Sequence, residues 1–408
     1  MTGIKVLHNS RLRTANAGAD LSALSQGEAQ RALRFHRTFP EYAPTPLHTL
    51  PGLARDLGVG QVFVKDESHR FGLNAFKVLG GAYAIGRYLA KALGRDIDDI
   101  SRDMLCSDAV RRQLGELTFA TTTDGNHGRG VAWTAQQLGQ KAVVYMPKGS
   151  ARERVDNILA HGAACTVTDL NYDDAVAMTW QKARANGWIM VQDTAWEGYE
   201  DIPTWIMQGY MTLALEALEQ MRALGTERPS HVLLQAGVGS FAGAVLGYLA
   251  SVLGADMPRF VIVEPHNANC IYTSARIGDG APHTVTGDLD TLMAGLACGA
   301  PNTVSWGLLR DYAHSYMSCP DYVAANGMRM LGAPLSGDPR IISGESGAVT
   351  TGALQWIMQH PDGAATREAL QLDDASRVLC VSTEGDTSPA TYRNVVWFGQ
   401  NPDGDRPC

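Results

Sequence analysis

The stretch that decides the fold reads HVLLQAGVGSFAGAVLGYLASVL and spans residues 231–253. Its first part, His231–Ala236, is mostly apolar and predicts a buried β-strand. A glycine-rich turn follows, and Ser240–Leu253 has the length and composition of a buried helix. No charged residue occurs from Val232 to Ala255. Because glycines interrupt that stretch, it favours a strand–turn–helix unit over a membrane-spanning helix.

The turn of this unit, Gly237–Ser240, has the composition of an anion-binding loop. Glycines there let backbone N–H groups approach a phosphate at the positive end of the helix. We favour this interpretation. The alternative is a dinucleotide fingerprint, because residues 237–243 also fit a G-x-G-x-x-x-G variant. Glu264 ends the next predicted strand, where a ribose-binding acid would be expected.

Outward from this unit, short β-branched runs alternate with helical patterns. The alternation predicts an α/β protein with open, mostly parallel twisted sheets and helices on both faces. Ligands of such sheets bind beyond the carboxyl ends of the strands, so the turns after strands matter most. The other predicted strands are Lys141–Pro147, Cys165–Thr168, Trp188–Asp193, Phe260–Glu264, Arg340–Ser343 and Arg377–Ser382. The other predicted helices are Ala151–His161, Tyr172–Asn186, Ile202–Leu224 and Gly347–Gln359.

Composition excludes several classes of protein. The chain has 408 residues, 45% of them hydrophobic and 19% charged, which is globular rather than disordered composition. Its net charge of −8 argues against binding to nucleic acid or to an anionic membrane. The seven cysteines are scattered without a C-x-x-C pair, so no metal site is expected, and a Cys270–Cys298 bridge is left open. Met1–Asp20 lacks the apolar segment of a signal peptide, and we expect a cytoplasmic protein.

Two polar motifs in the first third of the chain are candidate sites. Asn74–Lys77 precedes a helical run, and its lysine is either a solvated surface charge or a Schiff-base lysine. A Schiff-base lysine must be partly desolvated to be nucleophilic, which the apolar neighbours would favour. Thr121–Gly128, which reads TTTDGNHG, follows a predicted strand end at Leu117–Ala120. It is either a polar helix cap or a site, and it holds more donors and acceptors than a cap requires.

Two further motifs follow strands near the C-terminal end. Ser343–Gly347 opens a predicted helix, and Val381–Ser388 comes directly after the last predicted strand. Taken alone, each is explained equally well by helix capping and a surface turn.

Together the motifs resemble the fold-type II pyridoxal-phosphate (PLP) enzymes, the group of threonine dehydratase and the tryptophan synthase β chain. That group has a lysine preceded by Phe, an S-G-N-H-[AG] loop, a glycine-rich phosphate turn, an E-P-S-G-A helix start and an S-G-G-N turn. The same order occurs here in Phe76-Lys77, Asp124–Gly128, Gly237–Ser240, Glu345–Ala348 and Thr383–Asp386.

Longer segments are similar to one family within this group, the diaminopropionate ammonia-lyases. These segments are Thr123–Gly130, Gln192–Tyr210 and Ser382–Gly385. The chain departs from the general pattern of the group at two places: Asp124 stands where Ser is usual, and the Pro after Glu345 is missing.

The resemblance implies a PLP cofactor. Lys77 would hold it covalently, Asn126 would contact the ring 3′ oxygen and Thr383 would meet the pyridine nitrogen. Since a hydroxyl does not force that nitrogen to be protonated, the ring would be a mild electron sink that favours prompt β-elimination. The implied cofactor-binding residues are Phe76, Lys77, Asn126, Gly237, Val238, Gly239, Ser240 and Thr383. The implied substrate-binding residues are Thr123, Asp124, His127, Asp193, Tyr199, Glu345 and Ser346.

The implied reaction is α,β-elimination of 2,3-diaminopropionate to pyruvate and two ammonia. Lys77, Asp124 and Asp193 are the expected catalytic residues. Asp124 either acts as a base on the face opposite Lys77, so that D and L substrates are both accepted, or binds the β-ammonium of the substrate. Asp193 is a candidate for the same ammonium. The alternatives are a serine or threonine dehydratase, a β-replacing enzyme of the same fold and, more remotely, an NAD-dependent oxidoreductase.

The family pattern also implies the domain organisation. A large PLP-binding domain would comprise residues 1–87 and 187–408, and a smaller mobile domain residues 88–186. By analogy with the fold group, the chain is expected to form a homodimer that acts on a small amino acid, with no nucleic-acid or membrane partner.

Overall fold

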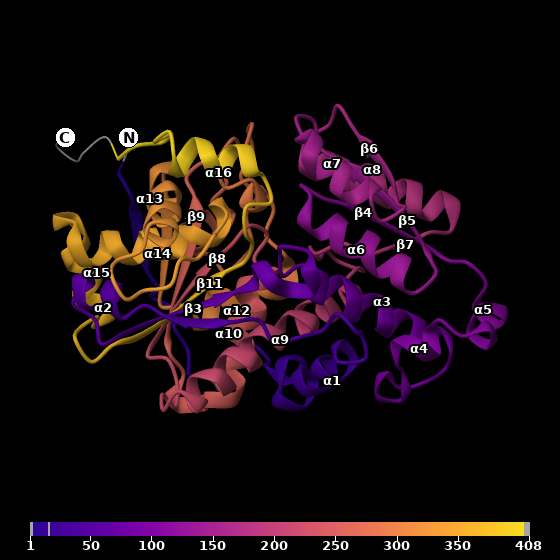
Figure 1. The fold of residues 1–408 in the computed structure, drawn as a ribbon, viewed down its shortest axis with the longest axis horizontal. Coiled ribbons are helices and arrows are strands. Elements are labelled where there is room, and N and C mark those ends of the chain that lie inside the picture. The colour runs from indigo at the N-terminus through magenta and orange to yellow at the C-terminus, as the bar shows by residue number, and fades with distance from the viewer. Residues whose placement is uncertain (1–2, 15–16, 404–408) are drawn as a thin grey trace.

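The computed structural model describes residues 3–14 and 17–403, and its strands form two separate sheets (Figure 1). The larger sheet has the order β1-β10-β9-β8-β11-β3-β2, and the smaller has the order β6-β5-β4-β7. In the larger sheet the inner strands are parallel, and only the edge strands β1 and β2 pair antiparallel. The strands are β1 (Lys5–His8), β2 (Leu47–Thr49), β3 (Gln61–Asp66), β4 (Thr118–Thr122), β5 (Lys141–Met146), β6 (Ala164–Val167), β7 (Ile189–Met190), β8 (His231–Gln235), β9 (Arg259–Pro265), β10 (Ser315–Cys319) and β11 (Arg377–Ser382).

Helices cover both faces of the larger sheet, which confirms the predicted fold class. Figure 1 shows α9, α10 and α12 on one side of this sheet and α13 and α14 on the other, while α6, α7 and α8 accompany the smaller sheet. The helices are α1 (Gln26–His36), α2 (Pro51–Leu57), α3 (Val78–Ala92), α4 (Arg102–Leu105), α5 (Asp108–Leu114), α6 (Asn126–Gln137), α7 (Arg152–Leu159), α8 (Tyr172–Asn186), α9 (Asp201–Ala223), α10 (Ser240–Leu253), α11 (Cys270–Ile277), α12 (Thr303–Tyr312), α13 (Asp321–Gly332), α14 (Glu345–Gln359), α15 (Ala364–Leu370) and α16 (Pro389–Val396).

The strand β8 shows why the sequence adopts this layered arrangement. Val232 and Leu234 point into the hydrophobic core on one face of the sheet, and Leu233 points into the core on the other. Successive side chains of a strand alternate between faces, so a strand covered on both sides must be apolar throughout. The unbroken apolar run predicted from the sequence is therefore the central strand of a doubly covered sheet.

Two predicted strands were wrong or too long. Arg340–Ser343 is not a strand: it pairs with none of the described strands, and Ile341 N–H donates to the Leu331 carbonyl of α13 instead. Trp188–Asp193 shortens to Ile189–Met190. Beyond it, the Gln192 side chain takes over the pairing: it accepts from Thr122 N–H at 2.9 Å and donates to the Thr122 carbonyl at 3.0 Å.

Helix α3, which begins directly after Lys77, is held against α9 at a glycine contact. A Cβ on Gly209 would collide with the carbonyl oxygen of Leu79, so the two backbones touch there. Only glycine permits such a close approach. The position of Lys77 is therefore fixed relative to α9.

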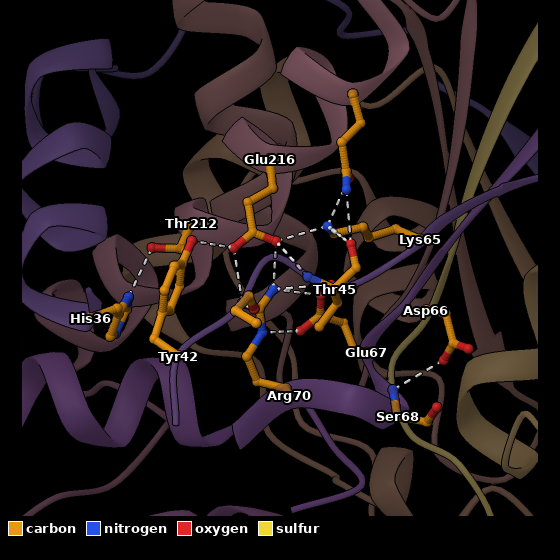
Figure 2. A network of polar contacts seen from close by, with 12 residues as sticks. His36, Tyr42, Thr45, Lys65, Asp66, Glu67, Ser68, Arg70, Thr212 and Glu216 are labelled. Atoms are coloured by element: carbon orange, nitrogen blue, oxygen red, sulfur yellow. Dashed lines mark hydrogen bonds and ion pairs between the residues drawn. The ribbon is translucent and has the colours of Figure 1, made fainter. Parts of the chain in front are cut away.

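A buried cluster of charged side chains also fixes the segment that precedes Lys77 in the sequence, by joining Lys65 and Arg70 to Glu216 of α9 (Figure 2). Glu216 of α9 accepts from Lys65 Nζ at 2.7 Å and from both terminal nitrogens of Arg70 at 2.8 Å. Arg70 also binds Glu67 at 2.8 Å, and these four side chains are almost completely buried. Two cations thus balance two anions, which is the arrangement in which buried charges are tolerated.

Other features of the described residues bear on the expectations above. No helix in the described ranges is long and apolar enough to cross a membrane. Cys270 and Cys298 are free thiols. Within the same ranges, no group of His, Cys, Asp and Glu side chains is arranged to hold a metal ion. The predicted tail, Gln400–Cys408, lies partly outside the described residues.

Candidate active site

One cavity brings together most of the residues that the motifs predicted. It lies where β8 and β11 end, where α10 begins, and beside the turns that follow β4 and β7 of the smaller sheet. This is the carboxyl end of parallel strands, as expected for an α/β protein. The predicted site residues that line it are Phe76, Lys77, Asp124, Asn126, Asp193, Gly237, Val238, Gly239, Ser240, Ser346 and Thr383.

The amine of Lys77 is paired with a carboxylate in this cavity. Lys77 Nζ lies 2.8 Å from Asp193 Oδ2, and both side chains are largely buried. Burial alone would raise the pKa of Asp193, but the Lys77 ammonium holds that pKa down to about 2. Burial alone would lower the pKa of Lys77, but Asp193 and Asp124 raise it above its ordinary value. Lys77 is therefore not a solvated surface lysine, and Asp193 forms a built site for an ammonium group.

The turn Gly237–Ser240 lines the cavity at the start of α10. Gly239 has φ of +97°, a conformation that favours glycine. A Cβ there would lie 2.9 Å from Leu309 and 3.0 Å from Ser305, so only glycine fits. The first N–H groups of α10 have no acceptor within the helix, and they carry the positive end of its dipole. This turn fits a phosphate group.

Two polar atoms at the cavity are buried without a partner among the described residues. They are the Tyr210 hydroxyl and Gln235 Oε1, and both residues line the cavity. Buried polar atoms are normally satisfied, so such orphans indicate a missing polar ligand. Phe76 lies between Tyr210 and Phe241, with ring centroids at 4.7 and 4.8 Å. An aromatic wall, an amine, orphaned polar atoms and a phosphate turn together fit PLP.

Four predicted residues do not line this cavity. Thr123 accepts from Gly125 and Gly128 N–H at 2.9 and 3.0 Å and so caps α6. His127 is buried, and its Nε2 contacts the Val191 carbonyl at 2.8 Å. Burial lowers the pKa of His127, which favours the neutral ring. The Tyr199 hydroxyl donates to the Met190 carbonyl and accepts from Gln192 N–H, both at 2.9 Å.

The fourth, Glu345, lies at the mouth of the cavity, where it meets a residue that the sequence analysis missed. Arg154 of α7 binds Glu345 Oε1 at 2.9 Å and Asp124 Oδ2 at 3.3 Å. Its guanidinium is buried, and it joins the helix layer of the smaller sheet to the start of α14. Arginine suits this position because its fork can bind two carboxylates at once.

Comparison with known proteins agrees with this geometry. The family model described as "Pyridoxal-phosphate dependent enzyme" matches residues 38–384. The chain belongs to the pyridoxal-phosphate dependent enzymes.

Within these enzymes, the chain belongs to the diaminopropionate ammonia-lyase family. It is 52% identical to the diaminopropionate ammonia-lyase of Salmonella typhimurium, covering 98% of this chain and 99% of that protein. It is 57% identical to the Escherichia coli enzyme, covering 92% of this chain and 93% of that protein. A crystal structure of the Escherichia coli enzyme in complex with D-serine superposes with a TM-score of 0.91, at 53% identity and 98% coverage of both chains.

Membership of the PLP enzymes excludes the alternative of a dinucleotide-binding fingerprint. The structure shows why Glu264 resembled the ribose-binding acid of such a fingerprint. Glu264 does not face a ligand: its carboxylate accepts from Ile271 and Tyr272 N–H at 2.8 and 2.6 Å and caps α11. Burial raises the pKa of Glu264 to about 8. Glu264 thus caps a helix, and an acidic residue at the end of a strand has the same sequence pattern whether it caps a helix or binds a ribose.

Other residues in or beside the cavity had weak sequence signals. Gln235 is a polar residue at the end of an otherwise apolar strand, which was a usable indication. Tyr172 lines the cavity, and its hydroxyl lies 3.3 Å from Asp193 Oδ1. Tyr172 and Arg154 both lie on amphipathic helices of the smaller sheet. Nothing in a helical pattern separates such residues from ordinary surface positions.

Proposed function

We propose that this chain catalyses the α,β-elimination of 2,3-diaminopropionate, which with water gives pyruvate and two ammonia. The observation that carries the proposal is 52% identity to a diaminopropionate ammonia-lyase along nearly the whole of both chains. The presence of Asp193 and Asp124 in the cavity supports it further, since this substrate carries a second ammonium group.

We assign the cofactor contacts by the motifs and by the lining of the cavity. Lys77 would hold the cofactor covalently, the Gly237–Ser240 turn would hold its phosphate, Asn126 would contact the ring oxygen and Thr383 the ring nitrogen. When bound, PLP supplies an electron sink for the negative charge left on Cα. Once the substrate's amine has displaced it, Lys77 Nζ would remove the Cα proton on its own face, for which the freed amine must be neutral.

Asp193 is assigned to the β-ammonium of the substrate. The support is that Asp193 already binds an ammonium, that of Lys77, at 2.8 Å in a buried position. When Lys77 forms its covalent bond, this buried carboxylate loses its ammonium partner and is free to bind another cation in the same place. The β-amine must leave as ammonia, and a group that stays protonated leaves far more readily than an amide ion.

Asp124 is assigned as the base on the face opposite Lys77. Asp124→Asn is expected to lower kcat/KM for the D enantiomer by about 10²-fold, the size of a lost general base, and to change the L enantiomer only a few-fold. Pyruvate release from each enantiomer measures the effect. Asp156→Asn, on the exposed side of α7, serves as the control. An equal loss with both enantiomers would instead assign Asp124 to substrate binding.

The substrate itself is tested by a panel of four amino acids. We expect pyruvate from D- and L-2,3-diaminopropionate with kcat/KM at least about tenfold above that for D- or L-serine, because only the diamines place a cation against the acidic side chains. Holoenzyme is assayed by coupling pyruvate to lactate dehydrogenase. If serine were the preferred substrate, the chain would be assigned as a dehydratase.

The proposal extends to the organisation of the molecule. Residues 88–186, which include most of the smaller sheet, form a domain that closes on residues 1–87 and 187–408. The Arg154–Glu345 contact supports this, because it links these two parts across the cavity mouth. Following the fold group, we propose a homodimer in the cytoplasm. The exposed Trp397 and Phe398 after α16 offer an apolar surface for a second copy.

A further inference from the structure

The carboxyl ends of β8 and β11 carry a chain of three hydrogen-bonded side chains. Gln235 Nε2 donates to Thr383 Oγ1 at 2.8 Å, and Thr383 Oγ1 donates to Glu384 Oε2 at 2.6 Å. The other oxygen of this carboxylate, Oε1, accepts from Gly347 N–H at 2.7 Å. All three side chains are buried, and all three line the cavity. None of the motif roles uses Glu384.

The hydrogen bonds of Thr383 determine whether its hydroxyl presents a proton or a lone pair to the cavity. The Gln235 amide is oriented by its second N–H bond, to the Val381 carbonyl at 2.9 Å, so the group facing Thr383 is a donor. A hydroxyl has one proton and two lone pairs. Thr383 therefore spends one lone pair on Gln235. Its proton and its remaining lone pair are divided between Glu384 and the cavity.

We propose that Glu384 is a positioning residue that sets the direction of the Thr383 hydroxyl. The ionised carboxylate takes the Thr383 proton, so Thr383 shows a lone pair to the cavity. A protonated Glu384 donates to Thr383 from Oε2, since Oε1 is held by Gly347, and Thr383 then turns its proton to the cavity. The inference rests on the proposed function, in which Thr383 meets the ring nitrogen.

Both the ionised and the protonated form of Glu384 are accessible near neutral pH, because the surrounding groups act on it in opposite directions. Glu345 at the start of α14 opposes the ionised form, while Arg154 of α7 favours it, together with the hydrogen bonds from Thr383 and Gly347. Burial is the largest influence and raises the pKa of Glu384 to about 7. As the pH falls through that value, Thr383 changes from acceptor to donor. A donor suits an unprotonated ring nitrogen and hence the mild electron sink.

The test follows the ring nitrogen directly, with PLP labelled with ¹⁵N at that position. In the holoenzyme the ¹⁵N resonance is expected to shift with pH near neutrality. In Glu384→Gln this pH-dependent shift is expected to be lost, because the amide donates permanently to Thr383. Glu345→Gln is expected to lower the midpoint by about one pH unit, since it removes a like charge. Glu264→Gln, a buried carboxylate away from the cavity, is the control and keeps the wild-type transition.

A wild-type transition in Glu384→Gln would overturn the inference. Thr383→Val gives a second test that does not depend on that variant: its ring nitrogen must lose the response to pH, and a retained response would equally overturn the inference. The apoprotein provides a readout without cofactor. On acidification the infrared carbonyl band of Glu384 appears, and Thr383→Val moves it to higher frequency because the carboxyl loses its acceptor. An unmoved band contradicts the hydroxyl geometry, whereas failure to bind PLP contradicts only the proposed function.

Discussion

Lys77→Ala is expected to abolish the elimination reaction and to remove the visible absorbance of the covalently bound cofactor. The loss in kcat/KM should be at least about 10⁴-fold, because one substitution removes both the covalent attachment and a general base. The buried position of Lys77, 2.8 Å from Asp193, is the structural reason for assigning both roles to it. Pyruvate release and the spectrum after reconstitution with PLP measure the two effects separately.

Lys91→Ala is the matched control for this prediction. Lys91 lies at the opposite end of α3 and is exposed, and its only ion pair among the described residues is with Asp201 at 3.3 Å. It should reconstitute and turn over like the parent. Should Lys77→Ala keep the spectrum and most of its activity, the assignment of the cofactor-binding lysine would be wrong.

Glu216→Ala is expected to lower the free energy of unfolding by about 3–5 kcal/mol, the usual effect of removing one partner of a buried ion pair. The variant leaves Lys65 and Arg70 buried with Glu67 as the remaining acid of the cluster. Urea unfolding of the apoprotein measures the loss.

The contribution of the Glu216 ion pairs to the stability of the unsubstituted protein depends on pH. Arg70 and Lys65 hold the pKa of Glu216 down to about 2 against the effect of burial. This stabilisation is therefore complete at pH values above the ordinary pKa of glutamate and is lost as the pH falls toward about 2.

The double variant Lys65→Met, Glu216→Leu separates charge from packing. It removes one cation and one anion, leaves Arg70 paired with Glu67, and fills the space with apolar side chains of similar volume. Most of the lost stability should return. If the double variant were less stable than Glu216→Ala, uncompensated charge could not be the cause of the loss.

The elements with strong local patterns could be predicted from the sequence nearly to the residue. The helix Tyr172–Asn186 was placed with its observed ends, because Asn171 caps it and Gly187 ends it in the left-handed conformation. The strand–turn–helix unit around Gly237–Ser240 was also right, since a buried strand and an anion-binding turn need distinctive residues. Lys77, the Gly237–Ser240 turn and both aspartates were singled out in the same way, each directly beside the end of an element, and they line one cavity.

What could not be predicted depended on the partners of each segment. Arg340–Ser343 has the composition of a strand, but its backbone contact is with α13, through Ile341 N–H and the Leu331 carbonyl, and not with a strand. Arg154 has no pattern of its own, and its importance arises only because Asp124 and Glu345 meet it from other elements. Glu384 was interpreted as part of a turn, and its hydrogen bond to Thr383, on which the proposed positioning role rests, is not revealed by spacing alone.

The glycine contact between α3 and α9 limits how this scaffold can be altered. Because the two backbones touch at Gly209 and Leu79, no side chain can be added at Gly209 without displacing α3, the helix that begins directly after Lys77. The loops 148–151 and 288–292 line a neighbouring cavity that shares Asp124 and Tyr172 with the site, so side chains can be exchanged there without disturbing this contact. Engineering for broader specificity should therefore begin with those two loops, and leave the helix crossing as it is.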